Sequence, residues 1–100
     1  MLLLGRPVAG AEAAEWQLVH QSVPDDQLET AAESVVLELS NGPTVALGLT
    51  KWLMHAGASA TVDDHLRNEA FALELSSRTE DFREGLTAFK EKRNPDFKGR

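Results

Sequence analysis

The chain has 100 residues, 42% of them apolar and 26% charged, which is ordinary for one soluble globular domain or a piece of one. A net charge of −6 argues against sequence-independent nucleic-acid binding, which needs a broad basic face. Cysteine is absent and three histidines are widely spaced, so disulfides, thiolate chemistry and a metal site are not expected. The apolar run MLLL is too short for a signal segment or a membrane span, and we expect a cytosolic protein without a membrane partner.

The predicted elements of the first 40 residues are helical, with one short exception. Good helix formers at 11–16 predict a short helix. At most a short extended segment is expected near 18–23, where apolar residues lead into Pro24. Apolar residues then recur at helical spacing over 25–40, behind two aspartates that suit a helix N-terminus. This pattern predicts the first of four main helices.

Three further helices are predicted from their start and stop signals. Asn-Gly-Pro at 41–43 ends one helix and begins the next, which Gly57 terminates. Thr61 is expected to cap the third helix, with Asp64 at the position of a capping box. Thr79 is expected to cap the fourth. The fold class is therefore mainly α, and we interpret Trp16 and Trp52 as core aromatics.

The charge is divided unevenly along the chain. The last eleven residues hold five of the ten Lys and Arg and two of the sixteen Asp and Glu, a local charge of +3, whereas the preceding 89 residues carry −9. Such a division indicates either a solubilising tail or an anion site.

An aromatic face precedes this basic tail. Phe82, Leu86 and Phe89 follow one another at i, i+4 and i+7, which places them on one face of a helix. Lys92 is three residues after Phe89, so an aromatic ring and an ammonium would lie one turn apart, as suits a nucleotide. In the alternative interpretation, Phe89 belongs to the core and Lys92 is a solvated residue at a helix C-terminus.

Three segments, read together, resemble the enoyl-CoA hydratase/isomerase (crotonase) family. They are LLLGRPVAGAEAAEWQLVHQSVP (2–24), NGPTVALGLTKWL (41–53) and TEDFREGLTAFKEKRNPDFKGR (79–100). Each segment alone is weak, but they follow in the order of the family and span nearly the whole chain. Gln17 departs from the pattern, because the family usually has glycine before Leu-Val, and this change can alter the local turn.

The resemblance implies a fold and a place in it. Residues 1–24 resemble the end of the family's spiral core and residues 25–100 its helical subdomain, so the chain resembles the C-terminal part of the crotonase fold. The family binds acyl-CoA thioesters, stabilises an enolate with two backbone N–H groups and uses carboxylates, often a glutamate pair, as acid and base. Those groups lie upstream of the matched stretch in the family. The hydratase, isomerase, hydrolase and dehalogenase subclasses are therefore not separated by these residues.

The resemblance also implies site residues and partners. Phe89 and Lys92 match the family's A-F-x-x-K-R and would contact the nucleotide part of CoA, often on a neighbouring subunit. Leu73 is predicted to form a wall of the acyl pocket. No separate cofactor is expected beyond the CoA thioester substrate, and the family's trimers and dimers of trimers imply a homo-oligomer.

No residue of the chain is predicted to be catalytic. Five carboxylates are candidates for acid–base catalysis only because of their residue type. We expect them to lie on solvated helix faces instead: Glu69, Glu74, Glu80, Asp81 and Glu84. For Glu84, a structural role in capping or pairing is expected. The chain is thus predicted to supply subunit contacts and part of the CoA site of an acyl-CoA enzyme, and to be inactive alone. The alternative is a non-catalytic helical module, derived from the crotonase fold, that binds protein.

Overall fold

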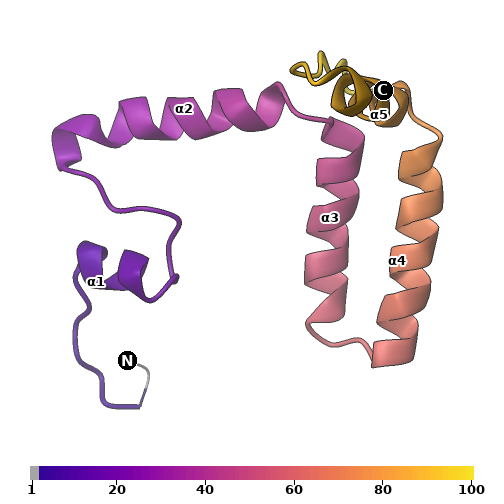
Figure 1. The fold of residues 1–100 in the computed structure, drawn as a ribbon. Coiled ribbons are helices and arrows are strands. Elements are labelled where there is room, and N and C mark those ends of the chain that lie inside the picture. Colours follow the sequence, from indigo (N-terminus) through magenta and orange to yellow (C-terminus); the bar gives the residue numbers. More distant parts are fainter. Residues whose placement is uncertain (1–2) are drawn as a thin grey trace. The chain divides into compact units, whose positions relative to one another are not determined.

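The computed structural model describes residues 3–100, which contain five α-helices, one 3-10 turn and no strand (Figure 1). In chain order these are α1 (Gly10–Glu15), η1 (Asp25–Gln27), α2 (Leu28–Ser40), α3 (Thr44–Gly57), α4 (Val62–Ser77) and α5 (Glu80–Glu91). The mainly helical prediction is confirmed, and residues 18–23 form bends and irregular backbone. Two residues of the predicted 1–24 segment, Met1 and Leu2, lie outside the described range. The chain divides into two compact units, one up to Val35 and one from Val36.

In the first unit, α1 ends in a Schellman turn. The amide of Leu18 donates to the carbonyl of Ala13 at 2.9 Å, and the amide of Gln17 donates to the carbonyl of Ala14 at 3.0 Å. Gln17 has a φ of 58°, in the left-handed region that favours glycine. Although the family usually has glycine here, Gln17 adopts the same left-handed conformation that a glycine would, and the turn that ends the helix is kept.

The two tryptophans are not core residues, and our interpretation of them is wrong. Trp16 is 46% exposed and Trp52 is 43% exposed. The guanidinium of Arg6 lies 5.0 Å from the centre of the Trp16 ring, a cation–π arrangement on the surface, and it also forms an ion pair with Glu12. An indole is a large side chain, and at neither position do the surrounding residues enclose it.

In the second unit, α3 and α4 run side by side as an antiparallel pair (Figure 1). Gly57, at the end of α3, allows this approach, because a Cβ atom there would lie 2.8 Å from Cε1 of His65 on α4. Thr61 caps α4 as predicted: its hydroxyl accepts from the amide of Asp64 at 3.2 Å and donates to the Asp64 carboxylate at 2.7 Å.

Helix α5 begins after its predicted cap, and the tail that follows it (92–100) returns along the helix. The hydroxyl of Thr79 accepts from the amide of Phe82 at 3.0 Å. The amide of Asp81 donates to the carbonyl of Arg100 at 3.0 Å, so the last residue lies beside the first turn of α5. Gly99 has a φ of 75° and approaches the start of α3, where a Cβ atom would lie 2.7 Å from Oγ1 of Thr44.

The described residues bury very little apolar surface. Only two hydrophobic residues in this range are buried, Ala72 at 4% exposure and Ala88 at 1%. Larger apolar side chains on α2 to α5 remain substantially exposed, among them Leu37, Trp52, Phe71 and Leu73. Because burial of apolar area is the main stabilising term in folding, each unit gains little of it from its own packing.

Candidate functional site

Phe89 and Lys92 lie at the C-terminal end of α5. The ring of Phe89 is 84% exposed, so it is not a core residue of the described chain. Helix α5 ends at Glu91, and Lys92 follows it with φ 55° and ψ 40°, the left-handed conformation. The helical i, i+3 geometry that the sequence predicted for this pair is therefore wrong, because Lys92 is outside the helix. The two residues are joined instead by the helix-ending turn.

This turn is a second Schellman motif. The amide of Lys92 donates to the carbonyl of Phe89 at 3.3 Å, and the amide of Arg93 donates to the carbonyl of Ala88 at 3.1 Å. A left-handed residue other than glycine costs about 1–2 kcal/mol, and a lysine has no side-chain hydrogen bond that would offset this, as asparagine has. The position is thus one where glycine would serve the fold better than lysine does.

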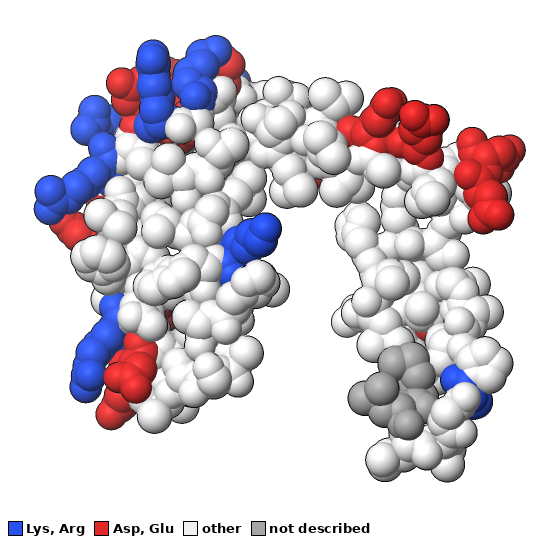
Figure 2. Space-filling view, turned by 180° about the vertical axis from the view of Figure 1, so that it is seen from behind, with Lys and Arg blue, Asp and Glu red and all other residues white. Residues whose placement is uncertain are grey.

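The tail's positive charges are mostly neutralised at short range. Arg93 pairs with Glu84 and Glu91, Lys98 with Asp96, and Arg100 with Glu80. Within residues 3–100, the two remaining tail bases, Lys90 and Lys92, take part in no ion pair. Figure 2 shows how basic and acidic side chains alternate over α5 and the tail, which lie at the upper left of that view.

The carboxylate of Glu84 has the strongest contacts with the tail's charged and polar groups. Hydrogen bonds from Arg93, and then one from the amide of Asp96, lower the pKa of the Glu84 carboxyl to about 2. The distances are 2.5 and 2.9 Å to the guanidinium nitrogens and 2.8 Å to the amide. The expected structural role of Glu84, pairing rather than catalysis, agrees with these contacts.

Asp81 is buried, and the expectation of a solvated carboxylate is wrong for this residue. It is 3% exposed, and its two oxygens accept from the amides of Lys98 at 2.6 Å and Gly99 at 2.8 Å. A buried carboxylate needs such partners, since burying it unpaired would be costly. No local sequence pattern predicts this burial, because the partners are 17 and 18 residues away along the chain.

The other three acid–base candidates remain on the surface. Glu74 forms an ion pair with Arg78, the residue that follows α4, and Glu80 pairs with Arg100. Glu69 is exposed at the side of α4 that faces α3. Residues 3–100 contain no group of three or more His, Asp or Glu side chains placed to hold a metal ion. In the same range, no helix combines the length and the apolar character that crossing a membrane requires.

Leu73 is on a different surface from the pair at the end of α5. It is 62% exposed and lines a hollow of about 220 Å³ between α3 and α4, together with Ala46, Leu49, Thr50, Leu53, Glu69, Ala72 and Ser76. Neither Phe89 nor Lys92 lines this hollow. The structure therefore places Phe89 and Lys92 at one turn and Leu73 in a separate hollow.

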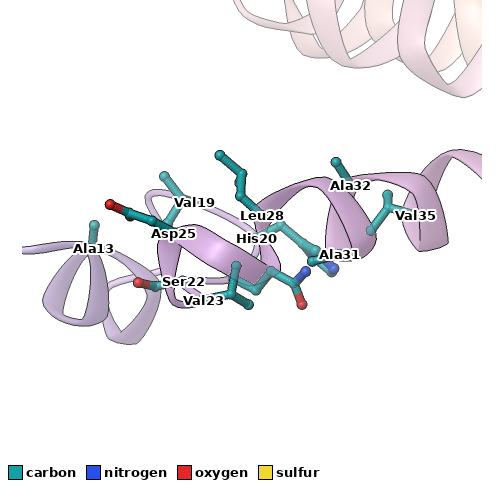
Figure 3. Close-up of a pocket in the computed structure, with 12 residues that line it drawn as sticks. Ala13, Val19, His20, Ser22, Val23, Asp25, Leu28, Ala31, Ala32 and Val35 are labelled. Atoms are coloured by element: carbon teal, nitrogen blue, oxygen red, sulfur yellow. The ribbon is translucent and has the colours of Figure 1, made fainter.

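The first unit has a hollow of its own, of about 550 Å³ (Figure 3). Leu28, Ala31, Ala32 and Val35 of α2 line it together with the chain from Val19 to Val23, and their side chains are drawn in Figure 3. His20, Gln21, Ser22 and Asp25 contribute its polar rim. Its walls are otherwise apolar, and it holds no cluster of titratable groups suited to acid–base chemistry.

The family profile described as "Enoyl-CoA hydratase/isomerase" matches residues 1–100. The chain belongs to this family. It is 35% identical over 100 residues to 1,2-epoxyphenylacetyl-CoA isomerase of Escherichia coli strain K12, covering all of this chain and 38% of that protein. It is 30% identical over 100 residues to 2,3-dehydroadipyl-CoA hydratase of the same strain, covering all of this chain and 39% of that protein.

Solved structures of the family agree with the fold of this member. A crystal structure of an enoyl-CoA hydratase from Bacillus anthracis matches with a TM-score of 0.81 and 35% identity, over 96% of this chain and 37% of that one. The chain thus spans about two fifths of the length of the curated relatives, and its helices are those of the C-terminal helical part of a crotonase-like fold. The family predicted from the three sequence segments is confirmed.

Proposed function

We propose that this family member supplies the C-terminal helical part of an acyl-CoA enzyme, with Phe89 and Lys92 as its contact with the nucleotide part of CoA. The observation that carries the proposal is the end of α5. There an exposed aromatic ring is followed by a lysine that has no ion-pair partner within residues 3–100, held in a strained turn. Strained backbone positions of this kind cluster at ligand-binding sites, and here the strain coincides with an exposed ring and with the ammonium of that lysine. The flat ring suits adenine and the ammonium suits a phosphate.

Two further roles belong to the same proposal. Leu73, exposed on α4, would form part of the wall around the acyl group, and the exposed apolar residues of α3 and α4 would form contacts between subunits. Of the five candidate carboxylates, Glu74, Glu80 and Glu84 are engaged in ion pairs, Asp81 holds the tail, and Glu69 lies exposed on the surface of α4, so the chain alone would be inactive. Incubation with crotonyl-CoA should leave the enoyl absorbance unchanged beyond the buffer rate. Turnover by the isolated chain would contradict this point.

The CoA contact is tested by titrating CoA into the protein by calorimetry at low and moderate salt. Lys92→Gln keeps most of the side-chain stem and removes the charge, and should weaken binding by on the order of 1 kcal/mol, as loss of a charge-assisted hydrogen bond does. The loss should shrink as salt rises, because exposed charges are screened. Lys98→Gln is the matched control, since Lys98 is in the same tail but already pairs with Asp96. Unchanged affinity for Lys92→Gln at both salt concentrations would make Lys92 an ordinary surface residue.

A protein-binding module without CoA affinity is the second candidate. Its support is the exposed apolar surface of the helices, where Leu37, Met54 and Phe71 are each at least 60% exposed. Apolar patches of this kind mark contact surfaces in soluble proteins. The same titration separates the two candidates, because a pure interaction module would give no heat with CoA in the wild type.

A further inference from the structure

The carboxylate of Glu84 accepts hydrogen bonds from the segment that follows Lys92. Both oxygens of Glu84 accept from the Arg93 guanidinium, at 2.5 and 2.9 Å, and one of them also accepts from the amide of Asp96 at 2.8 Å. The guanidinium is held on its other edge by Glu91, whose oxygen accepts from Nε at 2.7 Å. Residues 93 and 96 are thereby tied to the middle of α5.

The position of these bonds matters for Lys92. A helix that ends in a left-handed residue turns the following chain back across its last turn. The turn's own two hydrogen bonds, from the amides of Lys92 and Arg93, begin this path, and a further contact ties the returning segment to α5. Here the fixing group is an ion pair whose side chains are 24% exposed for Glu84 and 40% for Arg93, so water screens it less than an open surface pair. Because Lys92 immediately precedes Arg93, anchoring the guanidinium also restricts the backbone of Lys92.

We propose that Glu84 and Arg93 are positioning residues that hold Lys92 in its left-handed turn and so fix the direction in which its ammonium leaves the end of α5. This inference rests on the proposed CoA contact: the ligand would be the phosphate-bearing part of an acyl-CoA, and neither Glu84 nor Arg93 would need to touch it. Two residues nine positions apart thus act through a third, which is the one that meets the ligand.

The test combines two readouts on three variants: Glu84→Gln, Arg93→Gln and the double variant Glu84→Gln with Lys92→Gln. The first readout is CoA affinity by calorimetry. The second is the backbone conformation of Lys92 by NMR, from its ¹³C shifts and amide coupling, which report a left-handed residue without any ligand. Glu74→Gln is the matched control, because it removes a carboxylate from an arginine pair on α4, away from the turn.

We expect Glu84→Gln and Arg93→Gln each to weaken CoA binding by up to about fivefold, the factor that corresponds to loss of the Lys92 contact. The double variant should bind no more weakly than Lys92→Gln alone, because the effect of Glu84 passes through Lys92. Glu74→Gln should bind as the wild type does. A full additive loss in the double variant would overturn the inference, and so would wild-type affinity in both single variants where Lys92→Gln itself weakens binding.

The NMR readout keeps this inference separate from the proposed function. The positioning role is supported if Lys92 leaves the left-handed region in Glu84→Gln and keeps its left-handed conformation in Glu74→Gln. This holds even where Lys92→Gln leaves CoA affinity unchanged. Unchanged affinity of Lys92→Gln would overturn only the CoA contact. If Lys92 keeps its conformation in both Glu84→Gln and Arg93→Gln, the positioning role is overturned. Arg93→Gln also covers the case in which Glu84→Gln does not fold, since it leaves the Asp96 amide bonded to Glu84.

Discussion

Two residues of this chain, Gln17 and Lys92, occupy the same backbone position at the ends of two different helices. Each follows the helix in a left-handed conformation, with φ values of 58° and 55°. Each lies in a Schellman turn where glycine is the usual residue. Both positions therefore require the same left-handed backbone conformation. If substitution by glycine has different effects on stability or CoA binding at the two positions, the difference comes from the side chain that is removed.

Lys92→Gly should stabilise the protein while weakening CoA binding. Glycine relieves the left-handed strain, and after subtraction of its greater freedom in the unfolded chain a gain of roughly 0.5–1 kcal/mol remains. The lost ammonium should lower CoA affinity as much as Lys92→Gln does. Chemical denaturation followed by circular dichroism measures the first effect, and calorimetry the second.

Gln17→Gly is the matched control for this substitution. It should give a similar gain in stability and leave CoA affinity unchanged, because Gln17 is not in the proposed contact. A Lys92→Gly variant that is stabilised and binds CoA normally would show that the lysine at this turn serves no ligand.

The Glu84 carboxyl should contribute to stability at neutral pH and lose that contribution in acid. Its pKa is lowered to about 2 in the folded protein, against about 4.5 as its ordinary value. A carboxyl whose folded pKa is lower binds protons more readily in the unfolded chain, so stability falls as pH drops from about 4.5 towards 2. The difference in thermal stability between wild type and Glu84→Gln should therefore be constant above pH 5 and shrink below it. A difference that persists unchanged at pH 2 would show that the ion pair is not its cause.

At the scale of the elements, two glycines of α3 should respond oppositely to alanine. Gly48 has no heavy atom within 4 Å of where a Cβ would lie, so Gly48→Ala should stabilise α3 by roughly 0.5–1 kcal/mol. At Gly57, the new methyl group would lie 2.8 Å from Cε1 and 2.9 Å from Nδ1 of His65, and the ring would have to move. Overpacking of this kind costs roughly 1–3 kcal/mol, which exceeds the gain in helix propensity.

The measurement is the same for both variants: the free energy of unfolding by denaturant, with helix content as the signal. The pair serves as its own control, because both substitutions add one methyl group to one helix. Gly57→Ala as stabilising as Gly48→Ala would mean that α3 and α4 do not approach each other closely at this point.

Local chemistry predicted the element boundaries, and the parts it missed depend on partners far along the chain. Thr61 and Thr79 cap their helices at the predicted positions, since a cap needs only a hydroxyl and an amide three residues on. The burial of Asp81 and the tie between Glu84 and Arg93 depend on a tail that returns along α5, which has no periodic signature. The left-handed turn at Lys92 was missed because the usual signal, glycine, is absent there.

At the scale of the whole chain, the main feature is how much apolar surface the helices leave uncovered. Among residues 3–100, no large side chain is fully buried, and the buried hydrophobic residues are two alanines. On α4 alone, Leu66 and Phe71 are each more than half exposed. Since exposed apolar area of this extent is uncommon on a protein that works as a monomer, these faces are the ones that we expect subunit contacts to cover.

The purified chain should therefore not remain monomeric at micromolar concentration. Light scattering after size exclusion would show the expected self-association. Phe71→Glu should reduce it by placing a charge on an apolar face, since a buried unpaired carboxylate is strongly unfavourable. Thr87→Glu, an equal change of charge at an exposed position of α5, should leave self-association unaltered.

A wild-type monomer that unfolds cooperatively would contradict the expectation, because its helices would then be stable without a partner to cover their apolar faces. Equal association of wild type and Phe71→Glu would move the contact surface away from α4.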